Sequence, residues 1–187
     1  MQARIKERAR RLGLSTISTL IFVGACASFP RDIAQGMVNS WSPASAAAAR
    51  QLIDEYGTPN EISRNRLTWN RRGAWKRTVV WNRKPVALAP VDLAVMKQTI
   101  DYPLTPEQAR TLTGFSACLE IDPARGELSS RAGREEINFL LVNLAGEIVR
   151  GERTVAEAQA MFYRQLDLAA SGESATYMNG LVVPAGS

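Results

Sequence analysis

The sequence predicts an α+β fold: an N-terminal helix plus a β-hairpin, further strands, and two antiparallel C-terminal helices that close the domain. Three observations favour it. Apolar residues recur at helical spacing in residues 42–57 and 135–170. Residues 66–81 alternate between polar and apolar side chains, as half-buried strands do. Helices and hairpins fall in separate blocks, without the regular βαβ alternation of a parallel sheet.

The first helix is predicted to begin at Ser42-Pro43, since serine is a good N-cap and proline fits the first helical turn. Gly57 is expected to end it, and Pro59 follows, as is common after a helix. Its apolar face, at positions i, i+3, i+4 and i+7, comprises Ala49, Leu52, Ile53 and Tyr56. We expect this face to pack onto the core.

The next segment is predicted as a hairpin with strands at 66–69 and 75–81 and a turn at 70–73. Strict alternation places four side chains of the second strand on one face: Trp75, Arg77, Val79 and Trp81. It places the other four on the opposite face: Lys76, Thr78, Val80 and Asn82. One face of this strand is therefore expected to mix indole and guanidinium groups.

The remaining elements are predicted from the positions of glycine and proline and from the spacing of apolar residues. Residues 93–102 are predicted as a strand, 105–112 as a short helix, and 116–131 as a second hairpin that turns at 122–126. The apolar stripe of a long helix that ends at Gly151 comprises Ile137, Leu140, Leu141, Leu144 and Ile148. The last helix begins with a capping-box pattern, and its capping and inner-face residues are Thr154, Glu157, Val155, Ala158, Met161, Phe162 and Leu166.

The first 25 residues have the pattern of an export signal. Five Lys or Arg residues precede an apolar run of about 14 residues, shorter than the roughly 20 that span a bilayer. The run ends in Val23-Gly24-Ala25-Cys26, which resembles the lipobox of bacterial lipoproteins. In that family the signal peptide is cleaved before the cysteine, which then receives acyl chains. A plain secretory signal with a chance cysteine is the alternative.

The lipobox resemblance implies lipid attachment at Cys26 and a membrane-anchored place in the cell envelope. Residue 27 is alanine. An Asp there resembles the inner-membrane retention signal of Gram-negative lipoproteins, so the resemblance implies the outer membrane, facing the periplasm. The predicted organisation is a signal peptide at 1–25, a tether at 26–41, a single α+β domain at 42–170 and a flexible tail at 171–187.

Composition excludes several function classes. The chain has no histidine, so the commonest general base and the commonest metal ligand are missing. We therefore predict no catalytic residues, no metal and no cofactor. The net charge of +5 falls to +1 without residues 1–25, so no nucleic-acid partner is expected. With lipid on Cys26, Cys118 is the sole thiol; we expect it to be a buried strand residue, with pairing between chains as the alternative.

Residues 62–84 carry eight Lys or Arg and no acid, and three tryptophans interleave with them. The predicted interaction surface consists of Arg66, Trp69, Arg71, Arg72, Trp75, Lys76, Arg77, Trp81 and Arg83. Guanidinium groups bind phosphate and carboxylate, and indoles favour interfaces, so an envelope protein partner or anionic lipid is expected here. The alternative is that the tryptophans belong to the core and that the arginines stack on them and pair with acids elsewhere.

A second polar cluster surrounds the start of the first C-terminal helix. It comprises Arg131, Arg134, Glu135, Glu136, Asn138 and Asn143. A carboxylate such as that of Glu136, beside an amide on an apolar helix, suits acid–base catalysis. Capping of the helix and bonding to a neighbouring loop is the alternative, and we favour it because acids are stabilised at helix N-termini.

Two short stretches, Tyr56-Gly57-Thr58-Pro59 and Leu67-Thr68-Trp69, carry a further resemblance. Residues 42–82 resemble the small outer-membrane lipoproteins of the SmpA/OmlA type, whose family role is scaffolding in β-barrel assembly. The C-terminal half, including residues 143–149, is more similar to proteobacterial lipoproteins whose family implies no function. We therefore predict a non-enzymatic structural or interaction protein of the envelope. The alternatives are a periplasmic binding module for an anionic lipid or small ligand, and an enzyme; the oligomeric state stays open.

Overall fold

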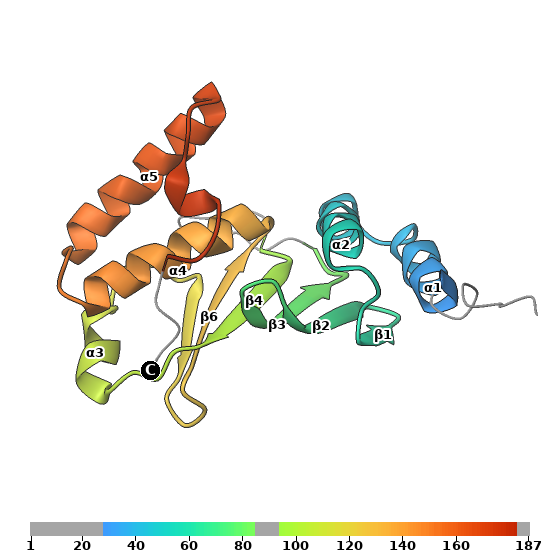
Figure 1. The fold of residues 1–187 in the computed structure, drawn as a ribbon, viewed down its shortest axis with the longest axis horizontal. Coiled ribbons are helices and arrows are strands. Elements are labelled where there is room, and N and C mark those ends of the chain that lie inside the picture. Colours follow the sequence, from blue (N-terminus) through green and yellow to red (C-terminus); the bar gives the residue numbers. More distant parts are fainter. Residues whose placement is uncertain (1–27, 85–93, 183–187) are drawn as a thin grey trace, which may run out of the picture.

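The computed structural model describes residues 28–84 and 94–182 (Figure 1). The elements follow in this order: α1 (Ser28–Val38), α2 (Pro43–Tyr56), β1 (Glu61–Ser63), β2 (Arg66–Arg72), β3 (Trp75–Trp81), β4 (Met96–Asp101), α3 (Pro106–Thr111), β5 (Leu119–Asp122), β6 (Glu127–Ala132), α4 (Glu135–Val149), α5 (Val155–Ser171) and a 3₁₀ turn, η1 (Thr176–Met178). The predicted signal peptide and Cys26 lie outside the described residues.

The six strands form one antiparallel sheet in the order β1-β2-β3-β4-β6-β5. Helix α2 packs on β2 and β3, α4 packs on β4 and β6, and α5 packs on α4. Figure 1 shows these helices on one side of the sheet, with α5 as the outermost layer. The predicted α+β fold, closed by two C-terminal helices, is thereby confirmed. The opposite face of the sheet carries no described helix.

Two apolar clusters lie between the helices and the sheet. The first surrounds α2 and includes Leu52, Ile53, Leu67, Trp69 and Val80, all fully buried. The second surrounds α4 and includes Leu128, Leu140, Leu141, Leu144 and Phe162. Tyr56, the last residue of α2, packs against both clusters. It therefore lies where the N-terminal helix–hairpin unit meets the rest of the domain.

Most predicted boundaries hold to within a few residues. Helix α2 has Pro43 in its first turn and ends at Gly57, whose φ of 73° favours glycine. The Ser42 side chain, however, bonds Ser45 and the Arg83 carbonyl instead of a backbone N–H of the helix. The predicted capping box of Thr154 and Glu157 is present at the start of α5.

Both ends of the domain are more ordered than predicted. Helix α1 occupies most of the expected tether and buries Ala34 and Val38. Beyond α5, the expected tail continues along α4 as far as Val182, and Met178 is buried there. Asn143 of α4 holds this segment through its side-chain amide, which bonds the carbonyls of residues 177 and 180 and the N–H of Val182.

The alternation of β3 is broken between its first and third residues. The Trp75 ring stacks on Phe139 of α4, with 5.0 Å between ring centroids. Arg77 instead binds Glu127 on the opposite face of the sheet. The prediction that Trp75 and Arg77 share a face is therefore wrong. Strand pairing lapses between them, at Lys76 opposite Arg71, which has a φ of 51°.

No helix within the described ranges is both long and apolar enough to cross a bilayer.

Candidate functional site

Two of the three tryptophans of the predicted interaction surface are buried in the core, and the third is half-buried. Trp69 is fully buried and donates its indole N–H to the Gly57 carbonyl at 3.0 Å. Trp75 is 2% exposed. Only Trp81 is half-buried, and the Arg83 guanidinium lies 4.9 Å above the centroid of its ring. Trp69 and Trp75 therefore lie in the core, as the core alternative predicted, and Trp75 reaches the surface only at the wall of a hollow.

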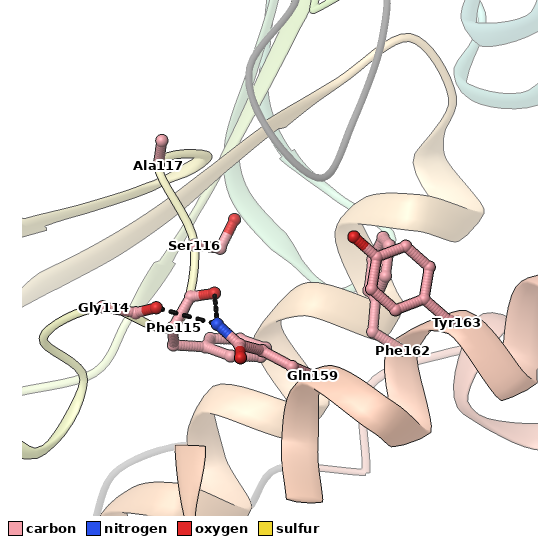
Figure 2. A pocket seen from close by; sticks show the side chains of 7 residues that line it. All are labelled: Gly114, Phe115, Ser116, Ala117, Gln159, Phe162 and Tyr163. Carbon is pink, nitrogen blue, oxygen red and sulfur yellow. Dashed lines mark hydrogen bonds between the residues drawn. The ribbon is translucent and has the colours of Figure 1, made fainter. Parts of the chain in front are cut away.

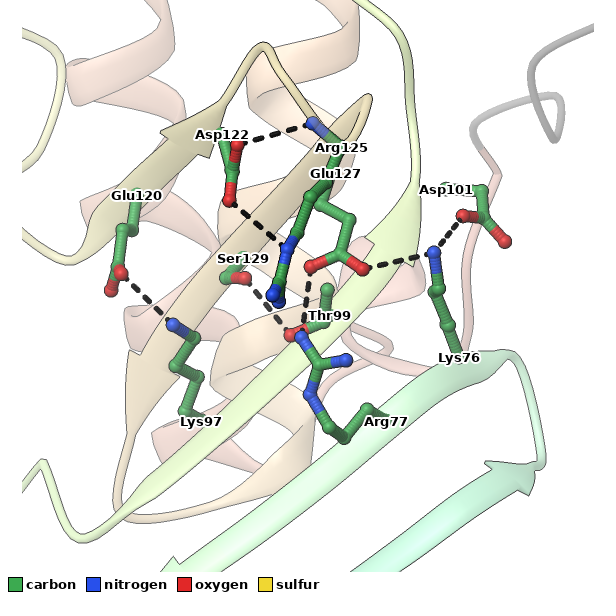
Figure 3. A network of polar contacts seen from close by, with 10 residues as sticks. All are labelled: Lys76, Arg77, Lys97, Thr99, Asp101, Glu120, Asp122, Arg125, Glu127 and Ser129. Atoms are coloured by element: carbon green, nitrogen blue, oxygen red, sulfur yellow. Dashed lines mark hydrogen bonds and ion pairs between the residues drawn. The ribbon is translucent and has the colours of Figure 1, made fainter.

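Three of the eight cations of the basic segment, Arg66, Lys76 and Arg77, are paired with acids in the described part of the chain. On the open face of the sheet, Lys76 contacts Asp101 at 2.5 Å and Glu127 at 2.9 Å, and Arg77 contacts Glu127 at 2.8 Å. Figure 3 shows both cations reaching from β3 toward the Glu127 carboxylate. At the other end of the hairpin, Arg66 lies 3.4 Å from Glu61. For these three cations the pairing matches the alternative in which acids elsewhere in the chain neutralise the segment, whereas Arg64, Arg71, Arg72, Arg83 and Lys84 make no ion pair with a described residue.

The paired carboxylates are held in their ionised form. The ammonium group of Lys76, together with Arg77, lowers the pKa of Glu127. Glu120 of β5 contacts Lys97 at 2.9 Å and Arg131 at 2.6 Å. Burial acts to raise the pKa of Glu120, but these two cations outweigh it and lower the pKa. This face of the sheet is thus largely charge-compensated, which leaves it little net attraction for an anionic partner.

The exposed end of the β2–β3 hairpin is different. Arg71 and Arg72 are exposed, and neither makes an ion pair with any residue that the structure describes. Arg71 is also the single non-glycine residue with positive φ in the described ranges, at 51°. Such a conformation is uncommon for a non-glycine residue and often marks functional sites. We call residues 71–74 the hairpin end.

The hairpin end is supported from below by a buried carboxylate. Gly73 lies so close to Tyr56 that an added Cβ would come within 2.8 Å of the phenol oxygen. That phenol donates to Glu135 of α4 at 2.6 Å, and the Trp75 indole N–H donates to the same carboxylate oxygen. The turn is therefore fixed to α2 and α4, so its two arginines project from a rigid base.

Glu135 also joins the centre of the sheet to α4. Gln98 of β4 donates to Glu135 at 2.6 Å and accepts from the Asn138 amide at 2.8 Å. Glu135 is 3% exposed, and Gln98 and Asn138 are fully buried. Burial and the bond to Glu135 raise the pKa of Tyr56, so this phenol stays a donor over the whole physiological range.

The polar cluster that the sequence pointed to is scattered by the fold. Glu135 and Asn138 are enclosed, Arg131 pairs with Glu120 on the open face, and Asn143 holds the C-terminal segment. Glu136 accepts a bond from Gln51 at 3.3 Å. Four hollows on the described part of the chain have lining residues that do not include Glu135, Glu136 or Asn138. Asn143, a further member of the cluster, lines a hollow of about 280 Å³ with Glu147 and Arg150, away from Glu135 and Glu136.

A hollow of about 440 Å³ adjoins the hairpin end. Its apolar wall includes Trp75, Ile100 and Leu181, and its rim carries Arg71, Lys76 and Asp101. Ile100 and Leu181 come from β4 and the C-terminal segment, and no local pattern in the sequence links them to the hairpin. The hollow can take an apolar group while Arg71 binds an attached anion.

A second hollow, of about 350 Å³, lies between α5 and residues 114–117 (Figure 2). Gln159 closes one side by donating to the carbonyls of Gly114 and Phe115 at 2.9 and 3.2 Å. Phe162 is buried, whereas Tyr163 is 55% exposed. No carboxylate or cation lines this hollow, so it offers an apolar contact but no acid–base pair. The sequence analysis missed it because Tyr163 lies outside the apolar stripe of its helix.

No group of three or more acidic or cysteine side chains within residues 28–84 and 94–182 is arranged to hold a metal ion. Comparison of the whole chain with protein-family models, curated proteins and solved structures found no match.

Proposed function

We propose that this chain is a lipid-anchored protein of the cell envelope that acts, without enzymatic activity, by binding a partner protein through the hairpin end. The observation that carries the proposal is the pair Arg71 and Arg72, which are exposed on a fixed turn and make no ion pair with any described residue. A backbone that is already fixed loses little entropy on binding, and exposed cations speed the encounter with an acidic surface. An acidic region of an envelope protein is the expected partner.

The envelope location rests on the first 27 residues. A basic segment, a short apolar run and Val23-Gly24-Ala25-Cys26 favour export and lipid attachment at Cys26. Ala27, instead of Asp, favours the outer membrane, with the domain in the periplasm. The likeness of residues 42–82 to SmpA/OmlA-type lipoproteins supports the same location and a role in outer-membrane maintenance or assembly.

The test is charge reversal at the hairpin end in the full chain. Arg71→Glu with Arg72→Glu should abolish capture of the partner by crosslinking in cells. The matched control is Arg110→Glu with Arg164→Glu, two exposed cations on α3 and α5 with no ion pair among the described residues. Lys76 and Arg77 are left unchanged because reversing them would break their contacts with Glu127. Equal capture by both double variants would refute the proposal.

The hollow beside Arg71 favours one second candidate, a binding module for an anionic lipid or small amphipathic anion. The test is flotation of the lipid-free chain with vesicles that contain phosphatidylglycerol. This candidate predicts binding that weakens with added salt, because screening reduces contacts between exposed charges. It also predicts loss of binding in Arg71→Glu. Absence of salt-sensitive binding would refute this candidate, and the protein-partner proposal would be the one that stands.

A further inference from the structure

We infer that helix α1 lies directly on the bilayer surface and holds the domain against the membrane, in place of a flexible tether. This inference rests on the proposed lipid attachment at Cys26. It concerns how the anchored domain is oriented, which the lipid modification alone does not decide.

The first step is the length of the connection. Cys26 precedes Ser28, the first residue of α1, by two positions. A fully extended chain covers at most about 3.6 Å per residue, so the Cα atoms of these residues are no more than about 7 Å apart. Acyl chains on Cys26 are buried in the bilayer, which places that residue at the membrane interface. The start of α1 must therefore lie at the level of the lipid headgroups.

The second step is that α1 belongs to the domain. Ala34 and Val38 of α1 are fully buried against α2, and Trp41, just after the helix, is 6% exposed. The indole N–H of Trp41 donates to the Arg64 carbonyl at 3.1 Å, which ties the end of α1 to the β1–β2 turn. Arg31 of α1 also contacts Asp54 of α2 at 3.2 Å. Moving α1 away from the domain would expose these apolar side chains, so the anchor and the domain move together.

The third step is the chemistry of the outer side of α1. Ile33 is 44% exposed, one of the few large apolar side chains in the described ranges that are so open to solvent. Its neighbour Asp32 is exposed and charged, which opposes deep insertion of this side of the helix and limits Ile33 to a shallow contact. Two exposed cations, Arg64 and Lys84, lie at the end of the β2–β3 hairpin opposite residues 71–74 and would attract anionic headgroups.

Figure 1 shows the consequence for the rest of the molecule. Helix α1 lies at one end of its longest axis, and α3 and α5 lie at the other. With α1 on the bilayer, the hollow between α5 and residues 114–117 lies at the end of the molecule far from the anchor.

The experiment uses the full lipidated chain in vesicles of phosphatidylethanolamine and phosphatidylglycerol. A nitroxide label is placed at Ile33→Cys or, as the matched control, at Tyr163→Cys, an exposed position at the far end of the molecule. Cys118 is 1% exposed, and the wild-type chain measures any labelling there. We expect the label at position 33 to be at least about threefold less accessible to a water-soluble nickel relaxant than the label at 163.

A third variant inserts about 12 Gly and Ser residues between Ala27 and Ser28, long enough to free the domain from the membrane surface. It should raise access at position 33 to the level at 163. Equal access at both positions without the insertion, unchanged protection after it, or spin–spin broadening that reveals a second copy over α1 would overturn the inference. Mass spectrometry of the same sample separates the two proposals: Cys26 without lipid refutes the anchor, whereas lipidated Cys26 with an accessible position 33 refutes only the membrane contact.

Discussion

Removal of the Glu135 carboxylate is the perturbation that most directly tests how the fold supports the hairpin end. In Glu135→Ala, three donors lose their acceptor: the Tyr56 phenol, the Trp75 indole and the Gln98 amide. The three donors differ in the other hydrogen-bond acceptors that they can reach. Tyr56 is half-buried and can turn toward water, and Gln98 already lies 3.3 Å from the Thr78 hydroxyl. Trp75, at 2% exposure, has no other acceptor among the described residues.

The magnitude follows from these differences. Leaving a buried donor without its partner costs about 1–3 kcal/mol, and removing one member of a buried charged network about 3–5 kcal/mol. Because two of the three donors have partial alternatives, we expect a loss of about 3–5 kcal/mol in the free energy of unfolding. Glu135→Gln keeps an acceptor oxygen and the side-chain volume, and should lose about 1–2 kcal/mol through the missing charge.

The assay is urea unfolding of the chain that begins at Ala27, followed by tryptophan fluorescence and far-UV circular dichroism. A loss of this size lowers the midpoint by about 2 M urea, because the slope for small domains is about 1–3 kcal/mol per molar. The control is Glu136→Ala, which removes a single bond from Gln51 and should cost less than about 1 kcal/mol. Equal midpoints for Glu135→Ala and Glu136→Ala would refute the view that this carboxylate joins α2, the sheet and α4.

Three further outcomes are expected. The pKa of Glu127 is lowered in the folded state, so the unfolded state binds more protons as the pH falls below about 4.5, and the free energy of unfolding drops. Glu127→Gln should therefore flatten the dependence of the urea midpoint on acid pH. An unchanged slope would contradict this role of Glu127. Gly73→Ala should cost about 1–3 kcal/mol in thermal or urea unfolding, because a φ of 55° and contact with Tyr56 both oppose a side chain; a stability equal to wild type would argue against the tight turn. Asn143→Ala should raise amide hydrogen exchange at least about tenfold in the segment from η1 to Val182 while α5 stays protected, because it removes three hydrogen bonds to this segment. Unchanged exchange would mean that these bonds do not stabilise the segment.

Local patterns were sufficient to predict the fold class and most elements. The apolar period of α2, the glycine after it and the alternation in β2 each depend on neighbours within a few residues. The two ends of the domain were mispredicted for other reasons. Helix α1 has an apolar side of its own, with Ala34 and Val38 one turn apart, which the prediction of a tether overlooked. The segment after α5 is short, and its order comes from packing against α4. Tertiary packing of this kind overrides local propensity.

The candidate site was predicted in part. The sequence identified the basic segment and left open whether its tryptophans are buried, and the structure places Trp69 and Trp75 in the core. The acids that neutralise Lys76 and Arg77 lie 25 and 50 residues further along the chain, so no window around the hairpin reveals them. The lapse in pairing that turns Trp75 toward α4 is likewise invisible to an alternation rule.

The charge left over after pairing falls at the two ends of one hairpin. Arg64 and Lys84 are exposed beside α1, and Arg71 and Arg72 are exposed at the hairpin end, separated by the length of β2. Seven residues of strand span about 20 Å, so the two pairs do not act as one patch. Because α1 follows the proposed lipid anchor directly, the first pair suits the headgroup region, whereas the second projects away from it. Under the two proposals, the segment that the sequence presents as a single basic surface would serve two different contacts: Arg64 and Lys84 would face the membrane, and Arg71 and Arg72 would face a partner protein.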